Sequence, residues 1–136
     1  MRQYDELIEG KICVGSADEA EAATLDQKAT RVFDVRVYGR GEEVSYNYTH
    51  SPIEENNEAE TIKKGAEQIA AAIRNGESVY IHCGSGTGRA AVMAAATLVE
   101  LGEASTIDAA MDTVIQKRKG ARFQPVMVDA LKNLYK

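Results

Sequence analysis

The fold of this chain is decided by VYIHCGSGTGR, residues 79–89. The stretch begins as an apolar, β-prone run, continues with a cysteine and five small residues, and ends at an arginine that opens a helix-forming segment. A buried strand, a glycine-rich turn and a helix N-terminus are therefore expected in succession. This order places Cys83 at the carboxyl end of a strand and directly before a helix.

The residues of this turn suit one chemical task, which is to hold a phosphate dianion against a thiolate. A cysteine acts as a nucleophile in its thiolate form. Backbone N–H groups and the helix N-terminus can form an anion-binding concavity beside Cys83, and glycines permit positive φ angles and close backbone approach. Arg89 adds a guanidinium that matches phosphate geometry. We predict that Cys83 attacks a bound phosphoryl group and forms a thiophosphate intermediate. The predicted phosphate-binding residues are Gly84, Ser85, Gly86, Thr87, Gly88 and Arg89.

Other interpretations of the turn fit less well. The glycine spacing differs from the Gly-x-Gly-x-x-Gly of dinucleotide-binding turns, and the absence of Gly-Lys-Ser/Thr excludes a nucleoside-triphosphate loop. A purely structural glycine-rich turn stays open as an alternative. We interpret Cys13 as a small core residue. His82 is expected to be buried and hydrogen-bonded, and to tune Cys83 indirectly.

The motif His82-Cys83-x5-Arg89 resembles the signature of cysteine-based protein phosphatases, most nearly the small dual-specificity type and its bacterial relatives. The resemblance extends to residues 11–15, 33–36 and 50–53 and to the C-terminal pair of helices, so it covers nearly the whole chain. It implies one phosphatase domain over residues 1–136, no cofactor, and a phosphorylated protein or small phosphomonoester as substrate.

Two positions depart from the family pattern. An aspartate some thirty residues before the cysteine serves the family as general acid, but no aspartate lies between Asp34 and Cys83. Alignment on the His-x-Pro-Ile stretch puts Glu55 at that position, 28 residues before Cys83, and a glutamate can do this work if it is protonated when needed. Glu54 and Glu58 are competing candidates, and a solvated acidic loop is the alternative.

The second departure is Ala90, where the family usually has a serine or threonine whose hydroxyl bonds the cysteine sulfur. Its absence predicts slow release of the thiolate in the second step, unless Ser85 or Thr87 supplies a substitute hydroxyl. It also leaves open a pseudophosphatase that binds phosphate or phosphopeptides without turnover. A rhodanese-like sulfurtransferase is a third interpretation, although the active loop of that family is generally shorter and lacks the Cys-x5-Arg spacing.

Composition limits the remaining functions. The 136 residues, 44% apolar and 27% charged, suit one globular domain with a proper core. Two cysteines give no disulfide framework and fit a reducing compartment. The polar start and the lack of an 18-residue apolar run favour a cytoplasmic protein, and the net charge of −5 argues against nucleic acid or an anionic membrane as partner. Two histidines and no Cys-x-x-Cys make a metal site unexpected.

Strands and helices are expected to alternate along the chain. Strands are expected at 12–15, 31–36 and 78–82, with a possible edge strand at 44–48. Helices are expected at 16–28 (opened by a capping box at Ser16), 58–75, 89–101, 105–120 and from Pro125 onward. This pattern predicts a single-domain α/β fold whose mainly parallel sheet has four to five strands flanked by helices, with the active-site loop between the central strand and a helix.

Ligands of such sheets bind beyond the carboxyl ends of the strands, where Cys83 lies. Asp34 and Arg36 are expected near the same rim, where they form a structural ion pair or a hydrogen bond to a loop. Gln124 is a candidate for placing the hydrolytic water. Because residues 84–88 include no lysine or arginine, we expect a substrate with a single charged group rather than a polyanion.

Overall fold

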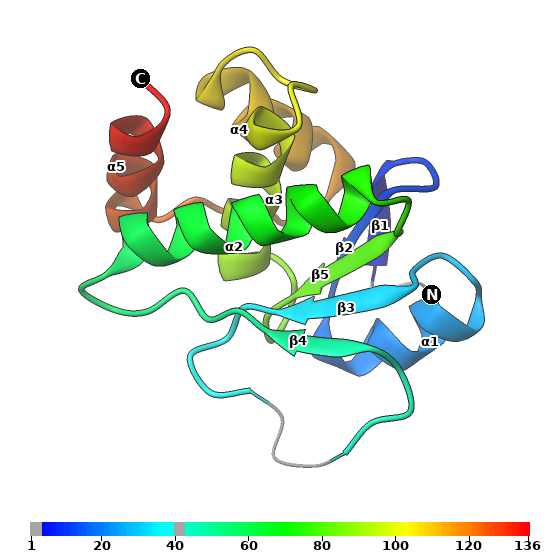
Figure 1. Cartoon of the computed structure of the whole chain (residues 1–136). Coiled ribbons are helices and arrows are strands. Elements are labelled where there is room, and N and C mark those ends of the chain that lie inside the picture. The colour runs from blue at the N-terminus through cyan, green and yellow to red at the C-terminus, as the bar shows by residue number, and fades with distance from the viewer. Residues whose placement is uncertain (1–3, 40–42) are drawn as a thin grey trace.

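The structure is a computed structural model that describes residues 4–39 and 43–136. Its strands are β1 (Tyr4–Ile8), β2 (Ile12–Gly15), β3 (Arg31–Asp34), β4 (Tyr48–His50) and β5 (Val79–His82). Its helices are the 3₁₀ turn η1 (Ala17–Glu19), α1 (Ala20–Leu25), α2 (Glu58–Arg74), α3 (Arg89–Glu100), α4 (Ile107–Lys117) and α5 (Pro125–Leu134). Figure 1 shows the strands side by side in one twisted sheet, with the helices packed around it.

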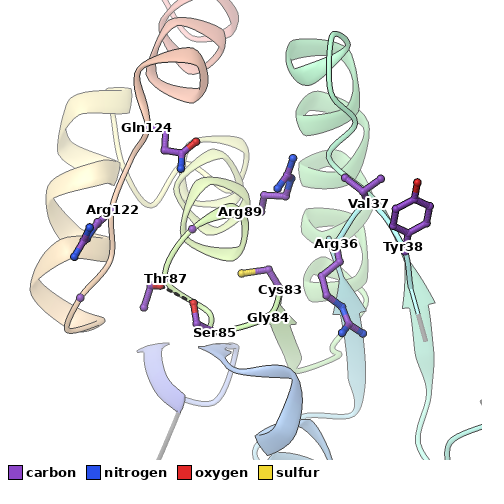
Figure 2. A pocket seen from close by; sticks show the side chains of 12 residues that line it. Arg36, Val37, Tyr38, Cys83, Gly84, Ser85, Thr87, Arg89, Arg122 and Gln124 are labelled. Carbon is purple, nitrogen blue, oxygen red and sulfur yellow. Dashed lines mark hydrogen bonds between the residues drawn. The ribbon is translucent and has the colours of Figure 1, made fainter. Parts of the chain in front are cut away.

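The five strands form one sheet in the order β1-β2-β5-β3-β4. The pairs β2–β5, β5–β3 and β3–β4 are parallel, and only the edge strand β1 runs antiparallel to its neighbour β2. This confirms the predicted α/β class and the mainly parallel sheet. In the register, His82 stands level with Gly15 on one side and Asp34 on the other. The three strands therefore end at the same edge, where Cys83 follows β5 (Figure 2).

Alternating side chains along the central strands build a separate core on each face of the sheet. In β5, Val79 and Ile81 join the larger cluster with α2–α5, whereas Tyr80 joins the smaller cluster with Ala20 and Ala23 of α1. The Tyr80 hydroxyl, buried on that side, donates to the carbonyl oxygen of Ser16 at 2.7 Å. Helices consequently cover both faces, as the alternation of strands and helices predicts (Figure 1).

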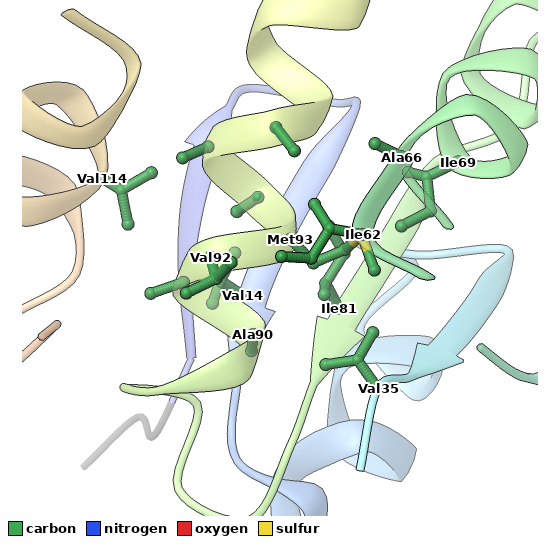
Figure 3. Packing of buried hydrophobic residues seen from close by; sticks show 14 of the residues in the cluster. Val14, Val35, Ile62, Ala66, Ile69, Ile81, Ala90, Val92, Met93 and Val114 are labelled. Atoms are coloured by element: carbon green, nitrogen blue, oxygen red, sulfur yellow. The ribbon is translucent and has the colours of Figure 1, made fainter. Parts of the chain in front are cut away.

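The larger core packs α3 against the sheet and among α2, α4 and α5 (Figure 3). Residues 90–98 of α3 are all buried, which confirms the expected central helix. Helix α2 buries one face, including Ile62, Ala66, Ile69 and Ile73, and this face packs against α3. Because the 83–89 loop joins β5 to α3, both of its ends are fixed by this core.

Several sequence-based boundaries were wrong, and the strand expected at 31–36 ends already at Asp34. The strand β1 was not expected, because its residues YDELI alternate weakly and carry two carboxylates. The helix after β2 begins as a 3₁₀ turn, ends at Leu25 instead of Lys28, and receives no capping bond from the Ser16 side chain. The edge strand comprises Tyr48–His50 instead of 44–48, since it pairs with β3 in the register Val32↔Tyr48. The helix expected at 105–120 begins at Ile107, with Thr106 as its side-chain cap, and ends at Lys117.

Within the described residues, the longest helices are too short or too polar to cross a lipid bilayer.

Candidate active site

Cys83 opens onto a pocket of about 760 Å³ at the carboxyl edge of the sheet. Three segments form its walls: the 83–89 loop, residues 36–38 after β3, and residues 120–124 between α4 and α5. Figure 2 shows the Cys83 sulfur directed toward the space that the loop encloses. The residue as a whole is 7% exposed, so its sulfur meets the pocket but little bulk solvent.

The carbonyl groups of the loop are bonded to donors outside it. Ala17 N donates to Gly84 O at 2.9 Å, Arg118 Nη2 to Ser85 O at 2.8 Å, Arg118 Nε to Gly86 O at 3.3 Å, and Arg122 N to Thr87 O at 2.8 Å. These donors come from the segment after β2, the end of α4 and the connection to α5. Three segments that are distant in sequence therefore hold the loop on the side away from the pocket.

This bonding decides which way the loop's N–H groups point. In a trans peptide, the C=O of one residue and the N–H of the next point in opposite directions, and no cis peptide bond occurs among the described residues. With the carbonyls of residues 84–87 bonded on the outer side, the N–H groups of residues 85–88 point to the inner side. No group in the described part of the chain accepts from them. The loop therefore presents a row of free donors, which is an anion-binding concavity.

Gly86 is the loop glycine that needs the conformational freedom of its residue type. Its φ is +81°, and a Cβ there would lie 2.3 Å from the carbonyl carbon and oxygen of Gly15. Gly84 and Gly88 have open space at the Cβ position. The close approach of Gly86 to the end of β2 places the loop directly against the sheet.

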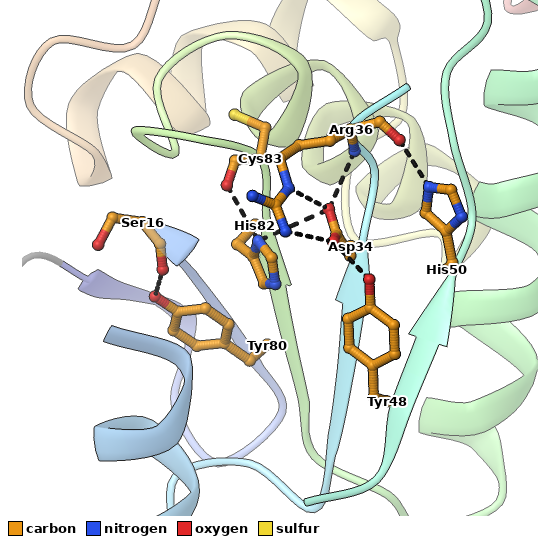
Figure 4. A network of polar contacts seen from close by, with 8 residues as sticks. All are labelled: Ser16, Asp34, Arg36, Tyr48, His50, Tyr80, His82 and Cys83. Carbon is orange, nitrogen blue, oxygen red and sulfur yellow. Dashed lines mark hydrogen bonds and ion pairs between the residues drawn. The ribbon is translucent and has the colours of Figure 1, made fainter. Parts of the chain in front are cut away.

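A buried polar network lies beneath Cys83 (Figure 4). Asp34 is fully buried and accepts bonds from Arg36 Nε at 2.9 Å, Arg36 Nη2 at 2.7 Å and the Tyr48 hydroxyl at 2.6 Å. His82, also fully buried, has Nδ1 3.0 Å from Cys83 O and 3.8 Å from Asp34 Oδ1. The expected structural ion pair of Asp34 and Arg36 is confirmed, and the same Arg36 also lines the pocket.

Hydrogen bonding controls the ionisation of Asp34. Burial acts to raise the pKa of this carboxyl, but the bonds from Arg36 and Tyr48 outweigh burial and hold the pKa below its ordinary value. Asp34 is therefore a carboxylate at neutral pH, and its charge fixes the Arg36 guanidinium at the pocket wall.

Arg89 joins the loop to the segment that carries the candidate general acids. Its Nε donates to Ile53 O at 3.3 Å, two residues before Glu55. Glu55 is exposed and does not line the pocket, and Glu54 lines a separate, smaller pocket beside Ser51 and Gln68. The structure thus brings Cys83, Arg89 and the loop together, and it leaves the carboxylate of Glu55 outside the pocket.

The two loop hydroxyls bond each other instead of the sulfur. Ser85 Oγ and Thr87 Oγ1 lie 2.7 Å apart, and no hydroxyl within the described residues bonds Cys83. Ala90 is fully buried at the start of α3. The missing family hydroxyl is therefore not replaced by either loop side chain in this conformation.

Several pocket and supporting residues escaped the sequence reasoning. Arg118 lies in the basic run Lys117–Lys119, which reads as a solvated helix end, and Arg122 follows in a short connection. Tyr38, 85% exposed, stands at the pocket rim with Val37. The loop interior carries no cation, as noted from its sequence, but Arg36 and Arg122 add arginines to the pocket walls. No local pattern marks these residues, because they reach the site only through the fold.

No three histidine, cysteine, aspartate or glutamate side chains among residues 4–39 and 43–136 are grouped so that they could hold a metal ion.

Comparison with known proteins agrees with this geometry. Residues 14–135 match the family model described as dual specificity phosphatase, catalytic domain. Human DUSP28 is similar in structure, with a TM-score of 0.84, 17% identity, and coverage of 98% of this chain and 93% of that one. Tk-PTP in its active form has a TM-score of 0.78 and 23% identity, with coverage of 96% of this chain and 95% of that one. PTPMT1 in complex with PI(5)P has a TM-score of 0.79 and 16% identity, with coverage of 98% of this chain and 94% of that one. None of the curated proteins matches the sequence significantly.

Proposed function

Because this chain belongs to the family of dual specificity phosphatase catalytic domains, it is a phosphatase, and we propose that it hydrolyses phosphomonoesters through a phosphocysteine at Cys83. One observation carries the proposal: the carbonyl groups of residues 84–87 are all bonded outside the loop, so successive N–H groups face the space before the Cys83 sulfur. Those donors suit the non-bridging oxygens of a phosphoryl group.

In the first step, the Cys83 thiolate attacks phosphorus. A P–S bond forms, the bond from phosphorus to the ester oxygen breaks, and the leaving oxygen takes a proton. The N–H groups of the loop and the guanidinium of Arg89 hold the three non-bridging oxygens, whose charge they stabilise throughout the displacement. The helix dipole of α3 acts in the same direction, since the loop leads into its N-terminus.

In the second step, water attacks the phosphocysteine. A P–O bond forms, the P–S bond breaks, and the sulfur leaves as the thiolate while the attacking water loses a proton. Gln124 lines the pocket and is the proposed residue for placing this water. Inorganic phosphate then leaves the loop.

We assign the proton transfers to Glu55. Its carboxyl group gives a proton to the ester oxygen in the first step and takes one from water in the second. The Arg89–Ile53 bond supports this assignment, because it ties the residue that binds phosphate to the segment that carries Glu55. The exposed position of Glu55 means that its side chain must turn toward the pocket when substrate is bound.

The proposed substrate is a phosphorylated protein or a small phosphomonoester. The 760 Å³ pocket is wider than a phosphate group requires, and Tyr38 and Val37 offer apolar surface at its rim. PTPMT1, one of the structural neighbours, has been solved in complex with PI(5)P. Neither the family nor the site favours sulfur transfer or binding without turnover.

The decisive test is hydrolysis of para-nitrophenyl phosphate by the parent protein, Cys83→Ser and Arg89→Ala. We expect turnover by the parent and none by Cys83→Ser, which should still bind orthovanadate because its N–H donors are unchanged. Arg89→Ala should lose both turnover and binding. Turnover that survives in Cys83→Ser would refute the phosphocysteine mechanism.

A further inference from the structure

Arg118, at the C-terminal end of α4, is buried to an extent that is unusual for a charged residue. Its side chain is 9% exposed, whereas arginines are rarely buried unless they are paired. It does not line the pocket, so it has no place in the reaction steps given above. Its burial therefore needs another explanation.

The contacts of Arg118 account for all three nitrogens of its guanidinium. Nη2 donates to Ser85 O at 2.8 Å, Nε donates to Gly86 O at 3.3 Å, and Nη1 lies 3.1 Å from Oδ2 of Asp5 in β1. The first two acceptors are consecutive carbonyl groups of the 83–89 loop. The planar guanidinium of Arg118 therefore bonds two adjacent peptide groups on the side of the loop opposite the pocket.

We propose that Arg118 is a positioning residue for anion binding, an inference that rests on the proposed function. By holding the carbonyls of Ser85 and Gly86 outward, it directs the N–H groups of Gly86 and Thr87 at the phosphoryl oxygens. A charged donor on a carbonyl also polarises the peptide group, and this strengthens the N–H of the same peptide as a donor to an anion. The guanidinium therefore acts on the bound phosphate through two peptide groups without touching it.

Asp5 has a separate and smaller part in this arrangement. Its side chain is 41% exposed and accepts from Nη1, the one nitrogen of the Arg118 guanidinium that does not bond Ser85 or Gly86. The pair ties β1 to the loop, but the acceptors that direct the N–H groups are the carbonyls of Ser85 and Gly86. Variants of Asp5 and Arg118 can therefore separate a role in the ion pair from a role in the loop.

The experiment compares the full-length parent with Arg118→Lys, Arg118→Gln, Asp5→Asn and Lys119→Met. Lys119 is the matched control, since it is the exposed neighbour of Arg118 and does not line the pocket. Three quantities are measured: the dissociation constant of orthovanadate, kcat/KM for para-nitrophenyl phosphate, and the protection that orthovanadate gives Cys83 against alkylation by iodoacetamide. Thermal unfolding of each variant is followed alongside.

We expect Arg118→Gln to weaken orthovanadate binding by about tenfold and to lower kcat/KM at least as much. Orthovanadate should protect its Cys83 from iodoacetamide less well, because weaker N–H donors hold the anion less tightly. Arg118→Lys keeps the charge but cannot grip two carbonyls in one plane, so it should fall between Arg118→Gln and the parent. Asp5→Asn should lose less orthovanadate binding and less kcat/KM than either Arg118 variant, because asparagine keeps an acceptor for Nη1. Lys119→Met should match the parent.

The inference would be overturned by folded Arg118 variants that bind orthovanadate as tightly as the parent, or by an Asp5→Asn loss as large as that of Arg118→Gln. Failure of both Arg118 variants to fold would also overturn it, since Arg118 would then serve the fold and not the site. A parent that neither binds orthovanadate nor hydrolyses the ester would instead refute the proposed function itself.

Discussion

The side chain of Arg89 donates from Nε to the carbonyl oxygen of Ile53, 3.3 Å away. This bond joins the 83–89 loop to the segment that follows β4. Two residues beyond Ile53 lies Glu55, and the N–H of the intervening Glu54 donates to the hydroxyl oxygen of Thr61 at the start of α2. The acid-bearing segment is therefore attached to the site at one end and to a helix at the other.

This attachment leads to a prediction about Glu55. The variant Glu55→Gln should lose about a hundredfold in kcat with an alkyl phosphate, whose leaving oxygen needs a proton, and only a few-fold with para-nitrophenyl phosphate. Steady-state kinetics with the two substrates measures the difference. Glu54→Gln is the matched control and should resemble the parent. Equal losses with both substrates would contradict the role of general acid.

The buried Ala90 leads to a prediction about the second step. Without a hydroxyl near the sulfur, departure of the thiolate from phosphocysteine should be slow, so rapid mixing of the parent with para-nitrophenyl phosphate should give a burst of nitrophenol. Ala90→Ser restores the hydroxyl and should raise the steady-state rate by about tenfold, the worth of one hydrogen bond to a charged group. The burst should shrink accordingly.

The control for this experiment is Ala91→Ser, which adds a hydroxyl to the adjacent buried position of α3. It should leave the burst unchanged. A linear trace from the parent at high enzyme concentration would show that phosphocysteine breakdown is not rate-limiting.

The contact of Gly86 with Gly15 predicts that Gly86→Ala damages the site. A Cβ at this position meets the backbone of β2 at 2.3 Å, and the φ of +81° disfavours any side chain. We expect a loss of about 2 kcal/mol or more in the free energy of unfolding together with weaker orthovanadate binding. Urea unfolding and calorimetry measure the two effects. Gly84→Ala, with open space at its Cβ, should keep the parent's stability.

The buried carboxylate of Asp34 predicts a pH-dependent contribution to stability. Its pKa in the folded protein is below the ordinary value, so the charged form stabilises the fold above about pH 3.9. That contribution declines as the pH falls below this value and disappears below the folded pKa. Asp34→Asn should therefore cost about 2 kcal/mol at pH 7, and the difference from the parent should narrow in acid.

Urea unfolding of the parent and Asp34→Asn between pH 7 and about pH 3 measures this difference. Asp129→Asn, at an exposed position of α5, is the control and should follow the parent throughout. A difference between parent and Asp34→Asn that stays constant over the whole range would argue against an ionised Asp34 in the folded protein.

The sequence by itself determined the elements whose signals are local. The run from Val79 to Arg89 specifies strand, turn and helix through neighbouring residues, and the spacing of Ile62, Ala66, Ile69 and Ile73 specifies the buried face of α2. The hydrophobic periodicity of a helix or strand and the residue types of a turn extend over only a few residues, so they can be recognised in the sequence. The place of Cys83 at the carboxyl edge of a parallel sheet followed from these signals.

Only the tertiary structure decided what surrounds the loop. Arg118 is 33 residues from Ser85 and 113 from Asp5 in sequence, and the strand β1 exists because β2 pairs with it. The same holds for Arg36 and Arg122, which reach the pocket from separate connections, and for Glu55, which the fold leaves exposed. A buried arginine and a solvated one look alike in a sequence, because the difference lies in carbonyl groups that only folding brings within reach.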